Sequence, residues 1–402
     1  MGARHVRWAR RTALAALTAA SLVLAACGGG GGTPSSGDGG GAGGGGGGTI
    51  KVGLLMPLTG QISQFGEQTR NGAMLAFKQK NNQVGNYTID VVTEDDKNDE
   101  AEAVARVQKL VTEDQVVVVI GSVSSRISIP VSEVLEEQGV VMISPTSTAD
   151  QLTPGKQWIF RACFYDSFQG EVMAKFAREQ LQADTAAILY DLANPYSEGL
   201  YKSFEAAFKE LGGNVVKVES YKTGDQDFRA QLTSIASANP DVLFLPDYYN
   251  PVGLIAQQAR EVGVKATLLG ADGWDDSQLY ELGGDAILGG YFSNHYSIEQ
   301  ENPESKAFVE AYRQEYGSDP SALAALGYDA ANLLLDAIQR VIDSGGDPTD
   351  PQQIRDALEQ TQGFKGVTGT ITFDENHNPV KDAVVLQTTE DGHKYVTTVS
   401  PQ

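Results

Sequence analysis

Two loops rich in hydroxyl side chains have the composition and position of an anion-binding site. Residues 121–125 follow a short apolar run and precede an expected helix, and residues 144–148 follow the next apolar run along the chain. Hydroxyls and free backbone N–H groups at a helix N-terminus bind carboxylate or phosphate without a basic side chain. A simple N-cap by Ser124 or Ser125 would explain the first loop equally well.

Asp272, in the second half of the chain, could receive a cation. It follows an apolar run and stands in the sequence Gly-Ala-Asp-Gly-Trp, so a turn-forming role is the alternative. Tyr196 and the pair Tyr248-Tyr249 also follow apolar runs. Aromatic side chains at such positions could wall a pocket, although packing or surface roles would also account for them.

The chain lacks the recognisable motifs of an enzyme or a metal site. Its four histidines stand outside any H-E-x-x-H pattern, and neither G-x-S-x-G nor G-x-x-x-x-G-K-[ST] occurs. Residues 94–99 resemble a calcium loop only superficially, because the glycine that such a turn requires is missing. A hydrolase that uses Asp272 and Asp275 is a weak alternative, since no nucleophile, base and orienting group can be assigned. We therefore expect no catalysis, no metal and no cofactor.

Charge and cysteine content restrict the partners and the chemistry. The 402 residues contain 30 Lys and Arg against 52 Asp and Glu, a net charge of -22, so nucleic acids and other polyanions would be repelled. Besides Cys27, the only cysteine is Cys163, which lies in an apolar run and is expected to be a small buried hydrophobe.

The N-terminal segment has the features of an export signal. Residues 1–26 contain no acid. Their first part carries four arginines, and the apolar stretch that follows, residues 13–26, is too short to span a bilayer as a helix. The stretch ends in Leu-Ala-Ala-Cys, which resembles the bacterial lipobox, so Cys27 is the expected lipidation site; a plain signal peptide with a chance cysteine is the alternative. Residues 27–48 are expected to form a lipidated, glycine-rich tether. The protein is thus predicted to be exported and held at the outer face of the cytoplasmic membrane.

From Thr49 onward, short β-branched runs alternate with longer stretches of helical period, which is typical of α/β domains with mostly parallel sheets. The length of this part suits two lobes rather than one core. Ligands bind at the carboxyl ends of strands in such sheets, where the loops described above would lie. Strands are expected at residues 50–56, 87–92, 115–120, 140–143, 185–190, 214–220, 241–245, 266–269, 367–373, 382–388 and 394–399. Helices are expected at residues 66–80, 101–112, 128–138, 167–181, 197–211, 227–237, 251–262, 304–316 and 321–343.

The ordered set of loops resembles the branched-chain amino-acid-binding proteins of ABC transporters, which have the type I periplasmic-binding fold. The matching segments run from Ile50 to near the C-terminus: KVGLLMPLTG, QFGEQTRNGAMLA, VIGSVSS, VVMISPTSTADQLT, FRACFYDSFQG, LLGADGWDD and GTITFDENHNPVKD. The resemblance implies an α/β fold of two lobes, residues 49–165 with 292–373 and residues 166–291 with 374–402. Three hinge crossovers would join the lobes near Tyr165, Tyr291 and Phe373.

The resemblance also implies roles for individual residues. The family's carboxylate-binding serine falls on Ser125, and its second hydroxyl loop falls on Thr146, Ser147 and Thr148, where Thr146 is larger than the usual alanine. The acid that meets the substrate ammonium falls on Asp272, although some members have Glu there.

Aromatic residues complete the implied pocket. Phe65, Tyr196 and Tyr248 would enclose the ligand, and Trp274 would support the ammonium-binding acid. Arg126 is interpreted as a solvated or lobe-bridging residue rather than as an anion clamp.

The resemblance implies a monomeric binding protein that closes on an amino acid by hinge rotation, the motion typical of periplasmic binding proteins. A branched-chain or aliphatic amino acid is the expected ligand, and an ABC permease is the expected partner. Alternatives are another small solute, such as an amide, urea or an aromatic acid, or a sensory role with a receptor as partner.

Overall fold

A computed structural model of the chain describes residues 47–300 and 303–401. The predicted signal peptide, the lipidation site Cys27 and most of the predicted tether lie outside these residues. Within the described ranges, none of the helices combines the length and the apolar character needed to cross a membrane.

The first sheet has six strands in the order β2-β3-β1-β4-β5-β6. Only the β2–β3 pair is antiparallel. Every residue of β4 and β5 is buried, as expected for parallel strands that are covered by helices on both faces. The strands are β1 (Thr49–Met56), β2 (Gln83–Val84), β3 (Tyr87–Asp95), β4 (Val118–Gly121), β5 (Val141–Ser144) and β6 (Ile159–Arg161).

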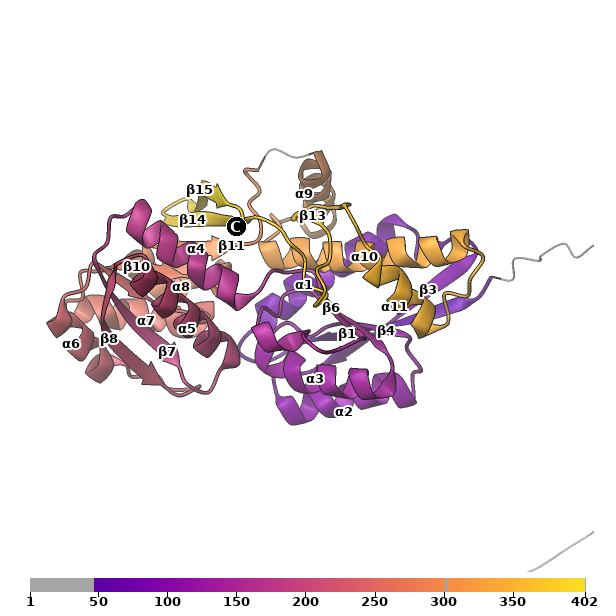
Figure 1. Ribbon diagram of the computed structural model, residues 1–402, viewed down its shortest axis with the longest axis horizontal. Helices are drawn as coiled ribbons and strands as arrows, with labels where there is room; N and C mark the ends of the chain where they lie inside the picture. The colour runs from indigo at the N-terminus through magenta and orange to yellow at the C-terminus, as the bar shows by residue number, and fades with distance from the viewer. Residues whose placement is uncertain (1–46, 301–302, 402) are drawn as a thin grey trace, which may run out of the picture. The chain divides into compact units, whose positions relative to one another are not determined.

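Helices cover both faces of the first sheet. Figure 1 shows α2 and α3 on one side of this sheet and α10 on the other, with α1 packed along α10. An added Cβ at Gly72 of α1 would lie 1.9 Å from the Ala324 carbonyl oxygen, and one at Gly327 of α10 would lie 2.1 Å from that of Thr69. Glycine at both positions therefore lets the two backbones touch. The helices are α1 (Ser63–Gln79), α2 (Glu100–Thr112), α3 (Ser125–Gln138), α9 (Pro303–Tyr316), α10 (Ala322–Asp343) and α11 (Pro351–Glu359).

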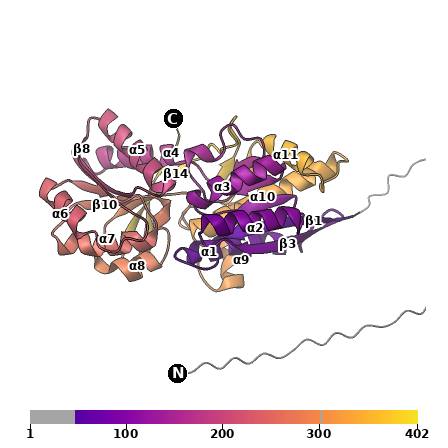
Figure 2. The same ribbon diagram turned by 90° about the horizontal axis from the view of Figure 1, so that it is seen from below.

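The second sheet has seven strands in the order β15-β14-β11-β10-β9-β7-β8. At one edge, β14 is antiparallel to β11, and β15 is antiparallel to β14. Figure 2 shows α4 and α5 on one side of this sheet and α6, α7 and α8 on the other. The strands are β7 (Thr185–Asp191), β8 (Asn214–Tyr221), β9 (Val242–Phe244), β10 (Thr267–Gly270), β11 (Tyr291–Asn294), β14 (Ala383–Thr389) and β15 (Gly392–Val399). The helices are α4 (Asp166–Glu179), α5 (Pro195–Glu210), α6 (Arg229–Ala238), α7 (Tyr249–Glu261) and α8 (Gln278–Gly283).

The chain passes between the two sheets three times: after β6, after β11, and after the small hairpin of β12 (Phe364–Gly366) and β13 (Gly369–Ile371). The second crossing differs slightly from the predicted boundary, because residues 292–294 pair within the second sheet. The fully buried Arg161 ties the first and third crossings together. Its Nε donates to Asn378 Oδ1 at 2.6 Å and its Nη1 to the Ala149 carbonyl oxygen at 3.0 Å.

Candidate functional site

Seven of the nine predicted ligand-binding residues line one cavity. Loops after β4 and β5, with α1 and α10, supply the residues of the first lobe; loops after β7, β9, β10 and β11 supply those of the second. These loops lie at the carboxyl ends of the strands, where ligands bind in open α/β sheets. The lining residues are Phe65, Val123, Ser125, Thr146, Thr148, Tyr196, Tyr248, Asp272, Gly273, His295, Leu323 and Leu326.

The loop before α3 leaves the N-terminus of this helix without a side-chain cap. Ser124 occupies the N-cap position, but its hydroxyl donates to Asn98 Oδ1 at 2.6 Å. The Ser125 hydroxyl accepts a hydrogen bond from the Ala149 N–H at 3.1 Å, so its own proton can be donated to a ligand. Capping through the side chain therefore does not explain these two serines. The Ile127 N–H already donates to the Ser124 carbonyl oxygen at 3.1 Å, so the backbone N–H groups of Ser125 and Arg126 are the donors that this helix end offers an anion.

The second hydroxyl loop contributes Thr146 and Thr148 to the cavity. The Thr146 hydroxyl donates to the Val123 carbonyl oxygen at 2.8 Å, whereas the buried Thr148 hydroxyl interacts with the buried Asp166 carboxyl group. Ser147 does not line the cavity. Its hydroxyl lies 2.5 Å from that of Ser128 and 3.0 Å from the Val123 carbonyl oxygen, so it joins the two loops instead.

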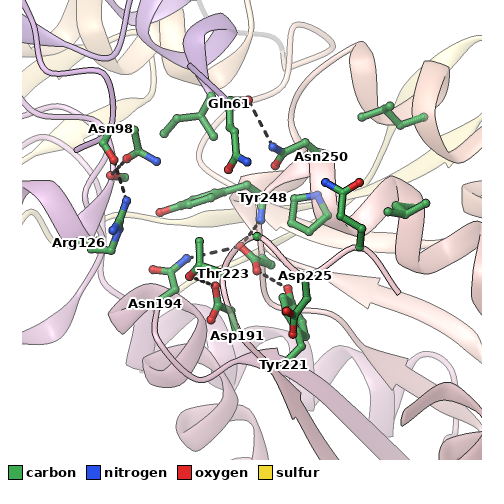
Figure 3. Close-up of a pocket in the computed structure, with 18 of the residues that line it drawn as sticks. Gln61, Asn98, Arg126, Asp191, Asn194, Tyr221, Thr223, Asp225, Tyr248 and Asn250 are labelled. Carbon is green, nitrogen blue, oxygen red and sulfur yellow. Dashed lines mark hydrogen bonds between the residues drawn. The ribbon is translucent and has the colours of Figure 1, made fainter. Parts of the chain in front are cut away.

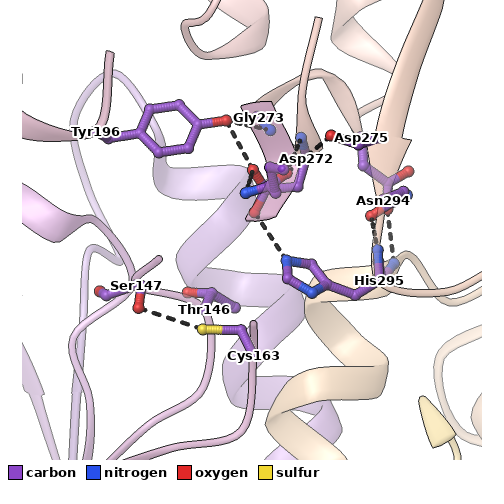
Figure 4. Close-up of polar contacts among 12 residues, drawn as sticks. Thr146, Ser147, Cys163, Tyr196, Asp272, Gly273, Asp275, Asn294 and His295 are labelled. Atoms are coloured by element: carbon purple, nitrogen blue, oxygen red, sulfur yellow. Dashed lines mark hydrogen bonds and ion pairs between the residues drawn. The ribbon is translucent and has the colours of Figure 1, made fainter. Parts of the chain in front are cut away.

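Asp272 is the acidic group of the cavity and is held by three donors, of which Figure 4 labels Tyr196 and His295. Its Oδ1 accepts hydrogen bonds from Tyr196 Oη at 2.7 Å and from Gln169 Nε2 at 3.1 Å. Its Oδ2 lies 3.0 Å from His295 Nε2. A carboxylate has about four acceptor positions, so one position on Oδ2 remains for a ligand.

Aromatic rings from both lobes form one wall of the cavity. Tyr196 and Tyr248 are stacked, with ring centroids 5.0 Å apart, and Phe65 meets the edge of Tyr248 at 5.9 Å. Burial, and secondarily the Asp272 carboxylate, raises the pKa of Tyr196 well above its ordinary value, so its hydroxyl is a proton donor. That hydroxyl also accepts from the Gly273 N–H at 2.9 Å, which fixes the loop after β10.

Trp274, which was predicted to support Asp272 within the ligand site, is fully buried and is not among the residues that line the cavity. Its ring occupies the space beside Gly270, where an added Cβ would approach the indole to 2.0 Å, and its Nε1 donates to the Leu245 carbonyl oxygen at 3.1 Å. The ring therefore packs beneath the loop that carries Asp272 and does not reach the cavity.

Cys163 is confirmed as a buried residue. Its Sγ donates to the Ser147 carbonyl oxygen at 3.2 Å, and burial raises the pKa of its thiol to about 12. A thiol with this pKa is a packing group and not a nucleophile.

A second, larger cavity adjoins the first and shares Tyr248 with it (Figure 3). Arg126 lines this outer cavity. It donates to the Asn98 carbonyl oxygen at 2.7 Å and lies 3.5 Å from Glu100, so its polar contacts are with its own lobe and it does not bridge the lobes in this structure. Across the outer cavity, Asp247 is buried, and burial raises its pKa to about 7.

Two polar residues of the site were missed by sequence reasoning. His295 directly follows β11, a short strand that the prediction omitted, so its position at a strand end was not visible in the sequence. Gln169 lies within the first turns of α4, and its contact with Asp272 depends on how that helix packs against the second sheet. Val123, Leu323 and Leu326 also line the cavity and carry no chemical signal in the sequence.

Comparison with known proteins identifies the family. The family model for periplasmic binding proteins matches residues 49–393. The leucine-, isoleucine-, valine-, threonine- and alanine-binding protein of Pseudomonas aeruginosa is 32% identical over 81% of this chain and 86% of its own. A Leu/Ile/Val-binding protein of Rhizobium johnstonii is 32% identical over 85% of this chain and 92% of its own.

Solved structures agree with the fold. A leucine-binding protein from Thermotoga maritima superposes with a TM-score of 0.84 and 36% identity, covering 88% of this chain and 99% of that one. A branched-chain amino acid transporter substrate-binding protein from Streptococcus pneumoniae, solved with isoleucine, has a TM-score of 0.82 and 33% identity over 88% of this chain and 100% of that one. The chain therefore belongs to the periplasmic binding protein family and has the two-lobed type I periplasmic-binding fold.

Proposed function

We propose that this protein is an extracytoplasmic solute-binding protein that captures a zwitterionic aliphatic amino acid between its lobes and delivers it to an ABC permease. The observation that carries the proposal is the pairing, within one cavity, of the Asp272 carboxylate with the uncapped N-terminus of α3. An α-amino acid carries one anion and one cation on neighbouring atoms, and this cavity offers one acceptor and one group of donors.

The two charges of the ligand would be bound by different lobes. The ligand carboxylate would accept from the Ser125 hydroxyl and from backbone N–H groups of the loops 121–125 and 146–148. The ligand ammonium would donate to Asp272 Oδ2 and to the Thr148 hydroxyl, which both line the cavity. Both charges need partners, because an unpaired buried charge costs several kcal/mol.

The remaining walls of the cavity are mostly apolar, and they would contact an aliphatic side chain once the lobes have parted to admit the ligand. Val123, Leu323 and Leu326 supply aliphatic surface, while Phe65 and Tyr248 supply aromatic surface. Asp272 is the only acidic residue that lines this cavity in the described part of the chain. Because it would bind the ligand ammonium, no acidic residue of the cavity is left to pair with a charged ligand side chain. The names of the curated relatives, which specify leucine, isoleucine and valine, support the same ligand class.

Contacts between the lobes beside the cavity would form on closure and break on release. Gln68 Nε2 donates to Asp276 Oδ2 at 2.9 Å, and Tyr249 Oη donates to the Gln61 carbonyl oxygen at 3.0 Å. Separation of the lobes breaks both contacts and opens the cavity to solvent, as hinge motion requires.

Membrane attachment is a further part of the proposal. The lipid on Cys27 and the tether of residues 28–48 would keep a monomeric binding protein close to its permease. Labelled palmitate should enter the wild-type protein in its host, and Cys27→Ala should remove the label and release the protein from the membrane fraction. Retention of the label in Cys27→Ala would overturn the assignment of the anchor.

The ligand proposal is tested on protein lacking residues 1–27, unfolded and refolded to remove carried-over ligand. Thermal unfolding is measured with each of the twenty amino acids and with urea, short amides and aromatic acids. A ligand present at a hundred times its dissociation constant adds about 2.7 kcal/mol of stability. Stabilisation by aliphatic amino acids is expected. Stabilisation only by amides or aromatic acids would overturn the ammonium role of Asp272.

A further inference from the structure

His295 occupies a position beside the binding cavity that the proposed function leaves without a role. The residue follows β11, is 2% exposed and lines the cavity. Its Nε2 lies 3.0 Å from Asp272 Oδ2. A carboxylate oxygen is an acceptor only, so Nε2 carries the proton and donates it in this hydrogen bond.

The two oxygens of Asp272 are held by different partners. Tyr196 and Gln169 both donate to Oδ1, whereas His295 is the one side chain among the described residues that donates to Oδ2. Oδ2 is therefore the oxygen with a free acceptor position. His295 sets the direction in which that position points.

The surroundings of His295 keep its ring fixed and neutral. The ring is stacked on Phe164, with centroids 3.7 Å apart, and its Nδ1 is buried without a hydrogen-bond partner in the described part of the chain. A second proton on Nδ1 would have no acceptor. Burial lowers the pKa of His295, and the neighbouring Lys381 acts in the same direction, while the carboxylates of Asp272 and Asp275 oppose the shift.

We infer that His295 is a positioning residue for recognition of the ligand ammonium: as a neutral donor it orients Asp272 Oδ2 without cancelling the negative charge of the carboxylate. A lysine or arginine at this position would bring a positive charge into contact with Asp272 and would compete with the ammonium. The inference rests on the proposed function and adds to it a residue that acts through Asp272.

Two substitutions separate the hydrogen bond from the packing of the ring. His295→Leu keeps an apolar side chain against Phe164 but removes the donor. His295→Gln retains an N–H donor that can reach Asp272. His377→Leu is a matched control, because His377 is also a buried histidine stacked on a phenylalanine, Phe160, and lies outside the cavity.

Affinity is measured by calorimetry for leucine and for 4-methylpentanoate, which is leucine without its ammonium group. In His295→Leu, leucine should bind about tenfold to a hundredfold more weakly, the range expected for a hydrogen bond to a charged group, while the affinity for 4-methylpentanoate should change less than threefold. His295→Gln should recover most of the loss. His377→Leu should leave the ratio of the two affinities unchanged.

The outcomes distinguish the inference from the function on which it rests. If wild-type protein binds leucine and His295→Leu binds it equally well, or if His295→Leu weakens both ligands equally, the positioning role is overturned and the proposed function stands. If the wild-type protein binds no amino acid, both are overturned. Circular dichroism and thermal unfolding of each variant verify that the fold is intact.

Discussion

Replacement of Asp272 by asparagine tests the ammonium site with the smallest change of shape. The amide can keep its oxygen at the Oδ1 position, where it still accepts from Tyr196 and Gln169. Its NH2 group then takes the Oδ2 position and lies against the N–H of His295 Nε2, so two hydrogen-bond donors meet without an acceptor. His295 must shift its proton to Nδ1, which is buried without a partner in the described part of the chain.

The effect on binding follows from these contacts. The variant loses a hydrogen bond to a charged group, about 1.5–3 kcal/mol, and it leaves the ligand ammonium buried opposite a donor. Removal of one partner from a buried charge pair costs about 3–5 kcal/mol. The affinity for leucine should therefore fall by a factor of about 100 to 5,000. The orphaned histidine proton should also lower the stability of the empty protein by about 1–3 kcal/mol.

Calorimetric titration with leucine measures the first effect, and urea unfolding of the empty protein measures the second. Asp329→Asn is the matched control, because Asp329 is a buried aspartate that accepts from the Val367 N–H and from the Thr368 N–H and hydroxyl, away from the cavity. The control should lose stability and keep its affinity. Asp272→Asn that binds leucine within threefold of wild type would refute the assigned role of this carboxylate.

Three further predictions concern the anion site, the pH dependence of stability and the helix contact. Ser125→Ala should weaken leucine binding only about fivefold in calorimetry, because backbone donors remain; a loss as large as that of Asp272→Asn would contradict this. Burial raises the pKa of Asp247 from 3.8 to about 7, so between these pH values the folded state binds one proton more than the unfolded state, and the free energy of unfolding falls by up to about 4 kcal/mol as pH rises. In Asp247→Asn, the free energy of unfolding in urea should depend less on pH over this range. An unchanged pH dependence would contradict this. Gly72→Ala places a Cβ 1.9 Å from the Ala324 carbonyl oxygen. The clash should lower the free energy of unfolding by about 1–3 kcal/mol even after the gain of about 1 kcal/mol from the better helix former. A raised urea midpoint would show that the two helices can separate without cost.

Much of the fold was predictable because its elements have strong local patterns. The strands expected at residues 50–56 and 185–190, and the helices expected at 304–316 and 321–343, agree closely with β1, β7, α9 and α10. These segments are long enough for their hydrophobic period to be read without tertiary information.

The prediction missed two short strands and one helix, and it joined two strands into one. β6 and β11 have three and four residues, too few to show alternation, and they are strands only because a neighbouring strand pairs with them. Residues 367–373 were expected as one strand, whereas 364–366 and 369–371 form a hairpin whose turn is residues 367–368. Gly369, which follows the turn, has a φ of 117°, in the range that favours glycine. The helix α11 was also missed.

The part of the candidate site that lies in loops directly after strands was predicted from the sequence. Hydroxyl loops and an acid flanked by glycines are visible in the sequence, and Ser125, Thr148 and Asp272 do line one cavity. Which residue of a loop turns inward was not visible, since Ser147 and Trp274 point into contacts of their own.

The order of the longer strands and helices, the lack of recognisable catalytic motifs and the acids and hydroxyls available to a ligand follow from residue type and local spacing alone. The partners of Asp272 depend on tertiary packing. Gln169 and His295 lie 103 and 23 residues from it in the chain. Contacts over such distances depend on how helices and strands pack, and that packing reflects the shape of many side chains at once rather than the identity of any one of them.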